Sequence, residues 1–297
     1  MIARTEAEGG ESITPEQSEV PPTFYGLIWD GNLIGRAGEP TSQDSPIVSQ
    51  RVTFKSGDLS LVGYLSKPDG PGPFPTVVWN HGSDPDPGSG PQFASLASMF
   101  VPAGYVVFAP MRRGHSDSEG EYIVDAIERE AASFGAAAGQ QLATLLLQTS
   151  QLDDQLAGLA FVRQQLFVDP ARIVVAGWSF GGIQTLLGAE SDAGYCAAVS
   201  ISPAAMMWAG NPDIRARLKT AVIRIRIPVF LIQPPKDASL EPARVLGPKL
   251  EQRNKLSRVK IYPAEGPEDE QVHCFGGPKG VHVWASDVLA FLNEVNC

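Results

Sequence analysis

The sequence has 297 residues, of which 43% are hydrophobic, and its 23 basic and 33 acidic residues give a formal net charge of −10. This length and composition predict one globular domain with a large core. The basic residues are scattered along the chain, so we expect no nucleic-acid partner. No apolar run approaches the roughly 18 residues that span a bilayer, so we expect no membrane partner either.

Cysteine and histidine usage gives no sign of a metal site. The three cysteines are too few and too irregularly spaced for a disulfide scaffold or a zinc site, and they imply an unpaired thiol. The four histidines never form the H-E-x-x-H pair of a zinc hydrolase. We expect no cofactor and a cytoplasmic location, with secretion after loss of a leader peptide as the alternative.

The chain begins with a segment that differs in composition from the rest. Residues 1–45 are rich in Glu, Pro, Gly and Ser and are predicted to form an N-terminal arm, followed by one domain at 46–297. That domain opens with RVTFKSGDLSLVGYLSKP, where apolar and polar residues alternate about a Ser-Gly-Asp turn. This alternation predicts an antiparallel hairpin with one buried face.

After Pro75 the pattern changes to short apolar runs separated by segments of helical length. Continuous apolar strands alternating with helices predict an α/β fold, with a mostly parallel central sheet and helices on both faces. Residues 121–167 are too long for a simple crossover and predict a helical excursion over the active site. The expected strands are TVVWN, YVVFAP, RIVVAGW, AAVSIS, VFLIQ and VKIYP, and the expected helices are Gln92–Val101, Ile183–Ala193, Pro242–Leu256 and Trp284–Val295.

The motif GWSFGG places a candidate nucleophile, Ser179, between the strand RIVVA and the helical segment IQTLLGAE. A serine on such a tight strand-to-helix turn needs small neighbours, because backbone passes close to backbone. A plain glycine-rich turn is the alternative. A phosphate-binding loop is disfavoured, because no lysine follows as in a P-loop.

Candidate oxyanion donors flank this serine. The N–H of Phe180, at the start of the following helix, is the first, and the N–H of Ser83, in the His-Gly-Ser turn after TVVWN, is the second. His81 in that turn could be mistaken for a catalytic base. We interpret it as a residue that fixes the loop through hydrogen bonds.

The acid and the base of a serine mechanism should follow later strands. Asp237 lies in the loop after VFLIQ and is the preferred acid, with Glu241 as a rival and a helix-capping role as the alternative. His273 and His282 follow the last strand, and either could be the base. We favour His273, because it lies ten residues after Pro263 in a loop long enough to reach Ser179, whereas His282 lies beside the final helix.

The chain resembles the dienelactone hydrolase-like branch of the α/β-hydrolases from about Arg51 to Val295. The resemblance rests on NHGS, RRGHSDSEG, QLDDQLAGLAFVRQQLFVDPARI, GWSFGG, and HCF with the downstream WASDVLAFL. It implies Ser179, Asp237 and His273 as the catalytic triad. Dienelactone hydrolases themselves carry cysteine at the nucleophile position, so this chain is a serine variant and dienelactone turnover is in doubt.

The expected function is hydrolysis of small or medium carboxylic esters through an acyl-enzyme, as in carboxylesterases. A serine peptidase of the prolyl oligopeptidase kind and a non-catalytic α/β-hydrolase scaffold are the alternatives. The residues ahead of Arg51 are too few for the propeller of such peptidases, which disfavours the first. A small-molecule ester is the expected partner, and the sequence does not predict an oligomeric state. The residues expected to line the substrate pocket are Trp178, Met206, Met207 and Trp208.

Overall fold

The computed structural model describes residues 49–297 apart from 88–90, 266, 268–270 and 278–279. All described elements belong to one compact unit, Pro46–Cys297. The predicted N-terminal arm lies outside the described residues and stays a prediction. In the described part of the chain, no helix is long and apolar enough to cross a membrane.

Eight strands form one sheet in the order β1-β2-β4-β3-β5-β6-β7-β8. The alternating segment forms the predicted β1–β2 hairpin about Gly57, whose φ of 56° suits a glycine at the turn. β2 pairs antiparallel with β4, and all later neighbours are parallel. The strands are β1 (Gln50–Ser56), β2 (Leu59–Ser66), β3 (Phe74–Asn80), β4 (Val106–Pro110), β5 (Val168–Trp178), β6 (Ala197–Ile201), β7 (Val229–Gln233) and β8 (Arg258–Ile261).

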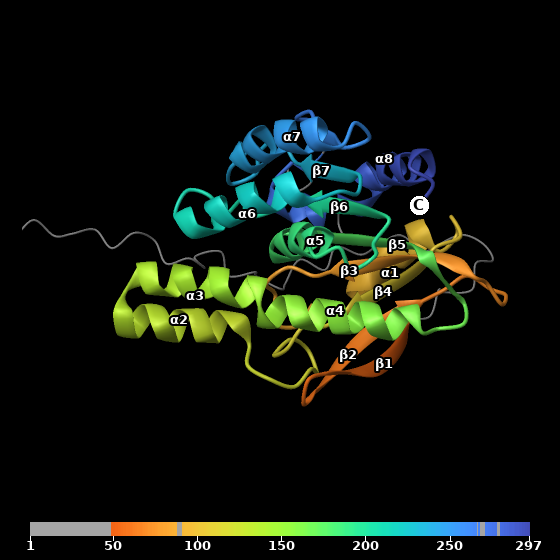
Figure 1. Ribbon diagram of the computed structural model, residues 1–297, viewed down its shortest axis with the longest axis horizontal. Coiled ribbons are helices and arrows are strands. Elements are labelled where there is room, and N and C mark those ends of the chain that lie inside the picture. Colours follow the sequence, from red (N-terminus) through yellow and green to blue (C-terminus); the bar gives the residue numbers. More distant parts are fainter. Residues whose placement is uncertain (1–48, 88–90, 266, 268–270, 278–279) are drawn as a thin grey trace, which may run out of the picture. The chain divides into compact units, whose positions relative to one another are not determined.

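Helices cover both faces of this sheet (Figure 1). On one face α1 and α8 pack together over a core that includes Trp79 and Trp284, whose rings stack with centroids 5.7 Å apart. On the other face four helices pack side by side, each against the next, in the order α4, α5, α6 and α7. The helices are α1 (Pro91–Phe100), α2 (Ile123–Phe134), α3 (Ala136–Gln148), α4 (Ser150–Arg163), α5 (Phe180–Glu190), α6 (Pro212–Arg224), α7 (Glu241–Arg253) and α8 (Val281–Glu294), with a short 3-10 turn η2 (His273–Gly276).

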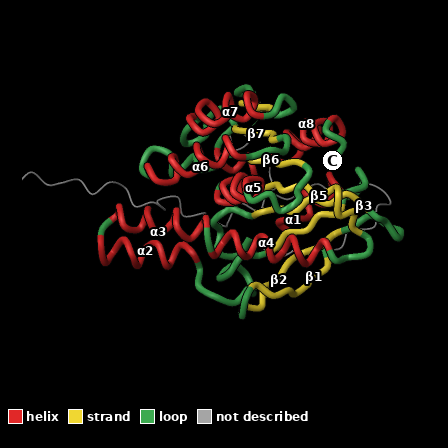
Figure 2. The backbone as a smooth tube through the Cα atoms, in the orientation of Figure 1, coloured by secondary structure: helices red, strands yellow, loops and turns green. Residues whose placement is uncertain are grey.

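The long interval between β4 and β5 contains three helices. α2 and α3 form a hairpin that turns at Gly135, whose φ is 91°. Figure 2 shows this pair projecting beyond the sheet, whereas α4 lies across it beside α5. Only α4 is therefore the crossover helix that connects the two strands. The interval is helical as predicted, and its placement over an active site remains a prediction.

Helix α6 has no counterpart among the elements expected from the sequence. Its start carries a clear local signal, because the side chain of Asn211 accepts a hydrogen bond from the Ile214 N–H at 3.0 Å and Pro212 occupies the first turn. Its buried side is narrow, with Ile214, Leu218, Ala221 and Val222, and charged residues interrupt the rest. Weak periodicity explains why the sequence pattern did not reveal it.

Candidate active site

Ser179 occupies a strained turn between β5 and α5. Its backbone φ of 60° and ψ of −118° lie in a region that residues other than glycine rarely adopt. The turn is also tightly packed: a Cβ on Gly181 would lie 1.9 Å from the carbonyl oxygen of Asn80, and one on Gly182 would lie 2.6 Å from that of Ile201. The glycines after the serine are therefore required by close backbone contacts.

The structure brings Ser179, His273 and Asp237 together. His273 Nε2 lies 3.0 Å from Ser179 Oγ, and its Nδ1 lies 2.7 Å from Asp237 Oδ1. Because an ionised carboxylate can only accept hydrogen bonds, Nδ1 carries the hydrogen and Nε2 is the acceptor for the serine hydroxyl. The Asp237 side chain is fully buried, and 17% of the His273 side chain is exposed. The imidazole is thus oriented with its basic nitrogen towards the serine.

Asp237 is held by groups other than the histidine. Its Oδ2 accepts a hydrogen bond from Gln233 Nε2 at 2.8 Å, and its Oδ1 accepts one from the Ala238 N–H at 2.8 Å. Gln233 ends β7, is fully buried, and also accepts from the Ala243 N–H. This glutamine was not among the residues predicted from the sequence. The available signal was a polar residue that closes the apolar run VFLIQ.

Trp178, directly before Ser179, contacts the turn that carries His273. Its indole Nε1–H donates to the carbonyl of His273 at 2.8 Å, and the two ring centroids lie 5.5 Å apart. Gly276 in the same turn lies so close that a Cβ there would be 2.1 Å from Trp178 Cδ1. The indole therefore positions the histidine backbone. Its predicted contact with substrate stays a prediction.

Phe180, the first predicted oxyanion donor, directly follows Ser179, and the loop that holds Ser83, the second, passes close to Ser179. Phe180 begins α5, so its N–H has no acceptor within the helix. The loop of Ser83 passes Ser179 closely, because a Cβ on the adjacent Gly82 would lie 3.6 Å from Ser179 Cβ. The hydroxyl of Tyr122, just before α2, donates to the Ser83 carbonyl oxygen. This arrangement is suited to stabilising an oxyanion formed at an acyl carbon attacked by Ser179.

Comparison with solved structures identifies this architecture. The structure aligns with an acylaminoacyl peptidase from Pyrococcus horikoshii with a TM-score of 0.60 and 17% identity, covering 84% of this chain and 42% of that chain. It aligns with the esterase Pf2001 from Pyrococcus furiosus with a TM-score of 0.61 and 17% identity, covering 85% of this chain and 96% of that chain. The chain adopts the α/β-hydrolase fold.

Two sequence comparisons match parts of this chain. The model of the prolyl oligopeptidase family matches residues 134–213, which include the nucleophile turn. The quorum-quenching protein AidA from Acinetobacter baumannii (strain MDR-ZJ06) is 30% identical over 152 residues, 51% of this chain and 43% of that protein. The chain thus spans less than half the length of this curated relative.

The loop that holds His81, Gly82 and Ser83 is fixed by a buried arginine. Arg112 donates through its two terminal nitrogens to the carbonyls of His81 and Gly82, at 2.9 and 2.8 Å. Burial lowers its pKa to about 9, so the guanidinium stays charged at neutral pH. Its backbone N–H donates to His81 Nε2 at 3.1 Å. His81 is an acceptor in this loop, and burial lowers its pKa well below the usual range, in agreement with the loop-fixing role expected of it.

The remaining predicted residues do not all meet at Ser179. Met206, Met207 and Trp208 lie between β6 and α6; Met207 and Trp208 are buried, whereas 45% of Met206 is exposed. Their role in substrate binding stays a prediction. The rival acid Glu241 pairs with Arg244 at the start of α7, and the rival base His282 is an exposed residue in the first turn of α8. Among the described residues, no cluster of His, Cys, Asp and Glu could hold a metal ion.

Proposed function

We propose that this α/β-hydrolase is a serine hydrolase that cleaves carboxylic esters through an acyl-enzyme on Ser179. The observation that carries the proposal is the hydrogen-bonded chain of Ser179, His273 and Asp237, with distances of 3.0 and 2.7 Å. These distances support a serine mechanism, because the imidazole can take the hydroxyl proton while the carboxylate orients the ring.

In the proposed cycle, His273 Nε2 takes the hydroxyl proton as Ser179 Oγ attacks the acyl carbon. Asp237 stabilises the imidazolium that forms, and the N–H groups of Phe180 and Ser83 bind the oxyanion. His273 then protonates the leaving alcohol, which leaves an acyl group on Ser179. A water molecule, deprotonated by the same imidazole, attacks the acyl-enzyme and releases the carboxylic acid.

A second candidate function is peptide hydrolysis. The prolyl oligopeptidase family match at residues 134–213 and the structural likeness to an acylaminoacyl peptidase support it. The likeness to an esterase over 96% of that enzyme's length supports the ester proposal. Membership in the dienelactone hydrolase-like branch is a further proposal, carried by the sequence motifs. The preferred acyl chain length depends on the pocket, for which Trp178, Met206, Met207 and Trp208 are the proposed lining.

Matched substrates distinguish these functions. The p-nitrophenyl ester and the p-nitroanilide of one short acyl group differ only in the bond to the leaving group. If the protein is an esterase, we expect the ester to be hydrolysed far faster than the anilide. Ser179→Ala should lower kcat for the ester by about 10³-fold or more with the fold intact, because it removes the nucleophile. Faster turnover of a peptide-like anilide would favour the peptidase, and wild-type turnover in the folded variant would exclude the serine mechanism.

A further inference from the structure

A pocket of about 360 Å³ lies at the edge of the sheet opposite Ser179. β5, β6 and β7 are parallel, and Ser179 follows the carboxyl end of β5. The pocket is lined from 189–195, which precede β6, from 223–227, which precede β7, and by Arg253, which ends α7. It is therefore at the amino ends of these strands and is separate from the proposed catalytic centre.

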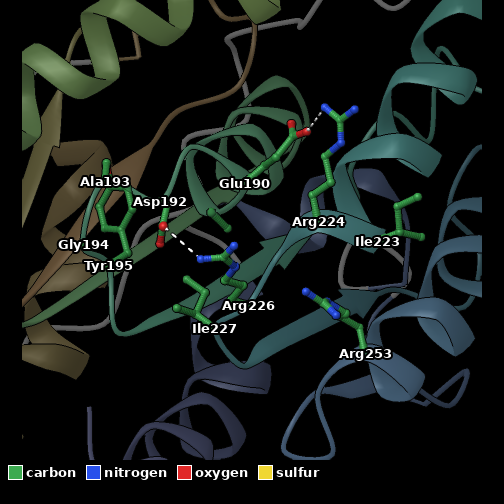
Figure 3. Close-up of a pocket in the computed structure, with 11 residues that line it drawn as sticks. Glu190, Asp192, Ala193, Gly194, Tyr195, Ile223, Arg224, Arg226, Ile227 and Arg253 are labelled. Atoms are coloured by element: carbon green, nitrogen blue, oxygen red, sulfur yellow. Dashed lines mark hydrogen bonds and ion pairs between the residues drawn. The ribbon is translucent and has the colours of Figure 1, made fainter.

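Three arginines line this pocket together with two carboxylates (Figure 3). Arg224 pairs with Glu190 at 3.3 Å, and Arg226 pairs with Asp192 at 3.5 Å. Among the described residues, Arg253 has no carboxylate partner and makes one hydrogen bond, from Nε to a backbone carbonyl at 3.3 Å. Its two terminal nitrogens are thus available to a ligand.

Two further arginines border the pocket and increase the positive charge. Arg217 forms an ion pair with Glu190, so this carboxylate is shared between two guanidinium groups. Arg163 donates to the carbonyls of Ala193 and Gly194 at 2.7 and 3.3 Å. Five guanidinium groups therefore line or border a pocket that is lined by two carboxylates, on a chain whose net charge is −10. The mutual repulsion of these groups favours a bound anion.

The pocket also has an apolar wall. Ile223 and Ile227 line it beside the arginines, and 53% of Ile223 is exposed to solvent. The pair of Arg226 and Asp192 competes poorly with a ligand, since both side chains are about three-quarters exposed, at 74% and 73%. An oxyanion could therefore engage the Arg226 guanidinium as well as that of Arg253.

We propose that this pocket binds a small organic anion: a carboxylate or phosphate group carried on a short apolar body. The oxyanion pairs with the terminal nitrogens of Arg253 and Arg226, because a guanidinium fork matches two oxygens of such a group. The apolar body packs on Ile223 and Ile227. This proposal does not depend on the esterase function, since none of these residues belongs to the catalytic triad.

Thermal unfolding of the full chain tests the site with hexanoate and phenyl phosphate as probes. A ligand that binds only the folded state raises Tm in a saturable way. We expect at least one probe to do so beyond the effect of sodium chloride at equal ionic strength, and the stronger of the two identifies the preferred oxyanion. Failure of both probes to exceed the chloride control would overturn the proposal.

Two matched variants on α7 locate the binding. Arg253→Gln should weaken the apparent affinity by about tenfold or more, because a charge-assisted bidentate contact is lost. Arg244→Gln, which removes an exposed arginine that pairs with Glu241, should leave the affinity unchanged. Arg226→Gln should reproduce the loss if Arg253→Gln proves unstable. The site would be wrong if Arg253→Gln and Arg226→Gln both kept the wild-type affinity for the probe. It would also be wrong if Arg244→Gln lost as much affinity as they do.

Discussion

Groups outside the proposed triad hold its parts in position: Gln233 and the Ala238 N–H bind the Asp237 carboxylate, and the Trp178 indole binds the His273 carbonyl. The GWSFGG turn predicted Ser179, and loop positions after strand ends predicted Asp237 and His273. Gln233 was missed as a support, because a polar residue at a strand end does not show which side chain it will bond, even though Asp237 lies only four positions later. Arg112 donates to carbonyls 31 and 30 positions earlier. Such contacts follow from tertiary packing, which local spacing does not encode.

Trp178→Phe tests the positioning of the base. Phenylalanine keeps an aromatic ring but cannot donate to the His273 carbonyl, so the turn loses a hydrogen bond worth about 1 kcal/mol. We expect kcat for an ester to fall about tenfold with little change in KM, since the loss affects alignment of the base. Steady-state kinetics of this variant should be compared with Tyr195→Phe, which also removes a buried hydrogen-bonding group but lies before β6, at the amino ends of the strands. An equal loss in both variants would contradict a positioning role.

His115 makes stability depend on pH. Burial, followed by the positive charge of Arg112, lowers its pKa to about 3 from 6.5. Between these values the unfolded chain binds a proton that the folded chain excludes, so the free energy of unfolding falls as the pH falls, by at most about 1.4 kcal/mol per pH unit for this group. Denaturant titrations from pH 7 to 4 should show a shallower fall for His115→Asn. Identical slopes would show that this histidine is not responsible.

At the scale of elements, strong periodicity or a clear boundary made prediction possible. The hairpin, the parallel strands and helices α1, α5, α7 and α8 were expected close to their observed positions. Helix α6 was missed because its apolar side is narrow. The disulfide between Cys196 and Cys297 was also missed, since 101 positions separate the two cysteines. Cys274 is the cysteine that remains.

The disulfide connects the segment before β6 to the chain beyond α8, and its removal should destabilise the fold. A cross-link across 101 positions restricts the unfolded chain strongly, and such bridges typically contribute about 2 to 4 kcal/mol. We expect a reducing agent to lower the free energy of unfolding of the wild type by this amount. The double variant Cys196→Ser/Cys297→Ser should show the same loss and no further response to reductant. If the free energy of unfolding of the wild type did not change under reducing conditions, the disulfide would not stabilise the chain.

The disulfide also bears on the compartment. Disulfides persist mainly in oxidising environments, so the bridge favours the secreted alternative over the cytoplasmic location expected from the sequence. Both remain predictions. Detection of the bridge in protein isolated from its native compartment, with thiols blocked at lysis, would distinguish them.

At the scale of the whole molecule, the two edges of one sheet carry different chemistry. The carboxyl edge holds the turn of Ser179, the proposed nucleophile, whereas the amino edge holds the arginine-lined pocket. The α/β fold and the first edge followed from the order of strands and helices, because the carboxyl ends of parallel strands meet at one edge. The arginine-lined pocket at the amino edge could not be predicted. Its arginines are dispersed in the sequence and converge only when β6, β7 and α7 pack together.

Covalent labelling tests the central claim, that His273 activates Ser179 as a nucleophile. The protein is exposed to a fluorophosphonate and the adduct is located by peptide mass spectrometry. We predict one adduct per chain, on Ser179, with a labelling rate that falls by about 10³-fold in His273→Ala and less than tenfold in His282→Ala. An adduct on another serine, no adduct on the folded wild type, or the reverse order of the two histidine variants would contradict the account.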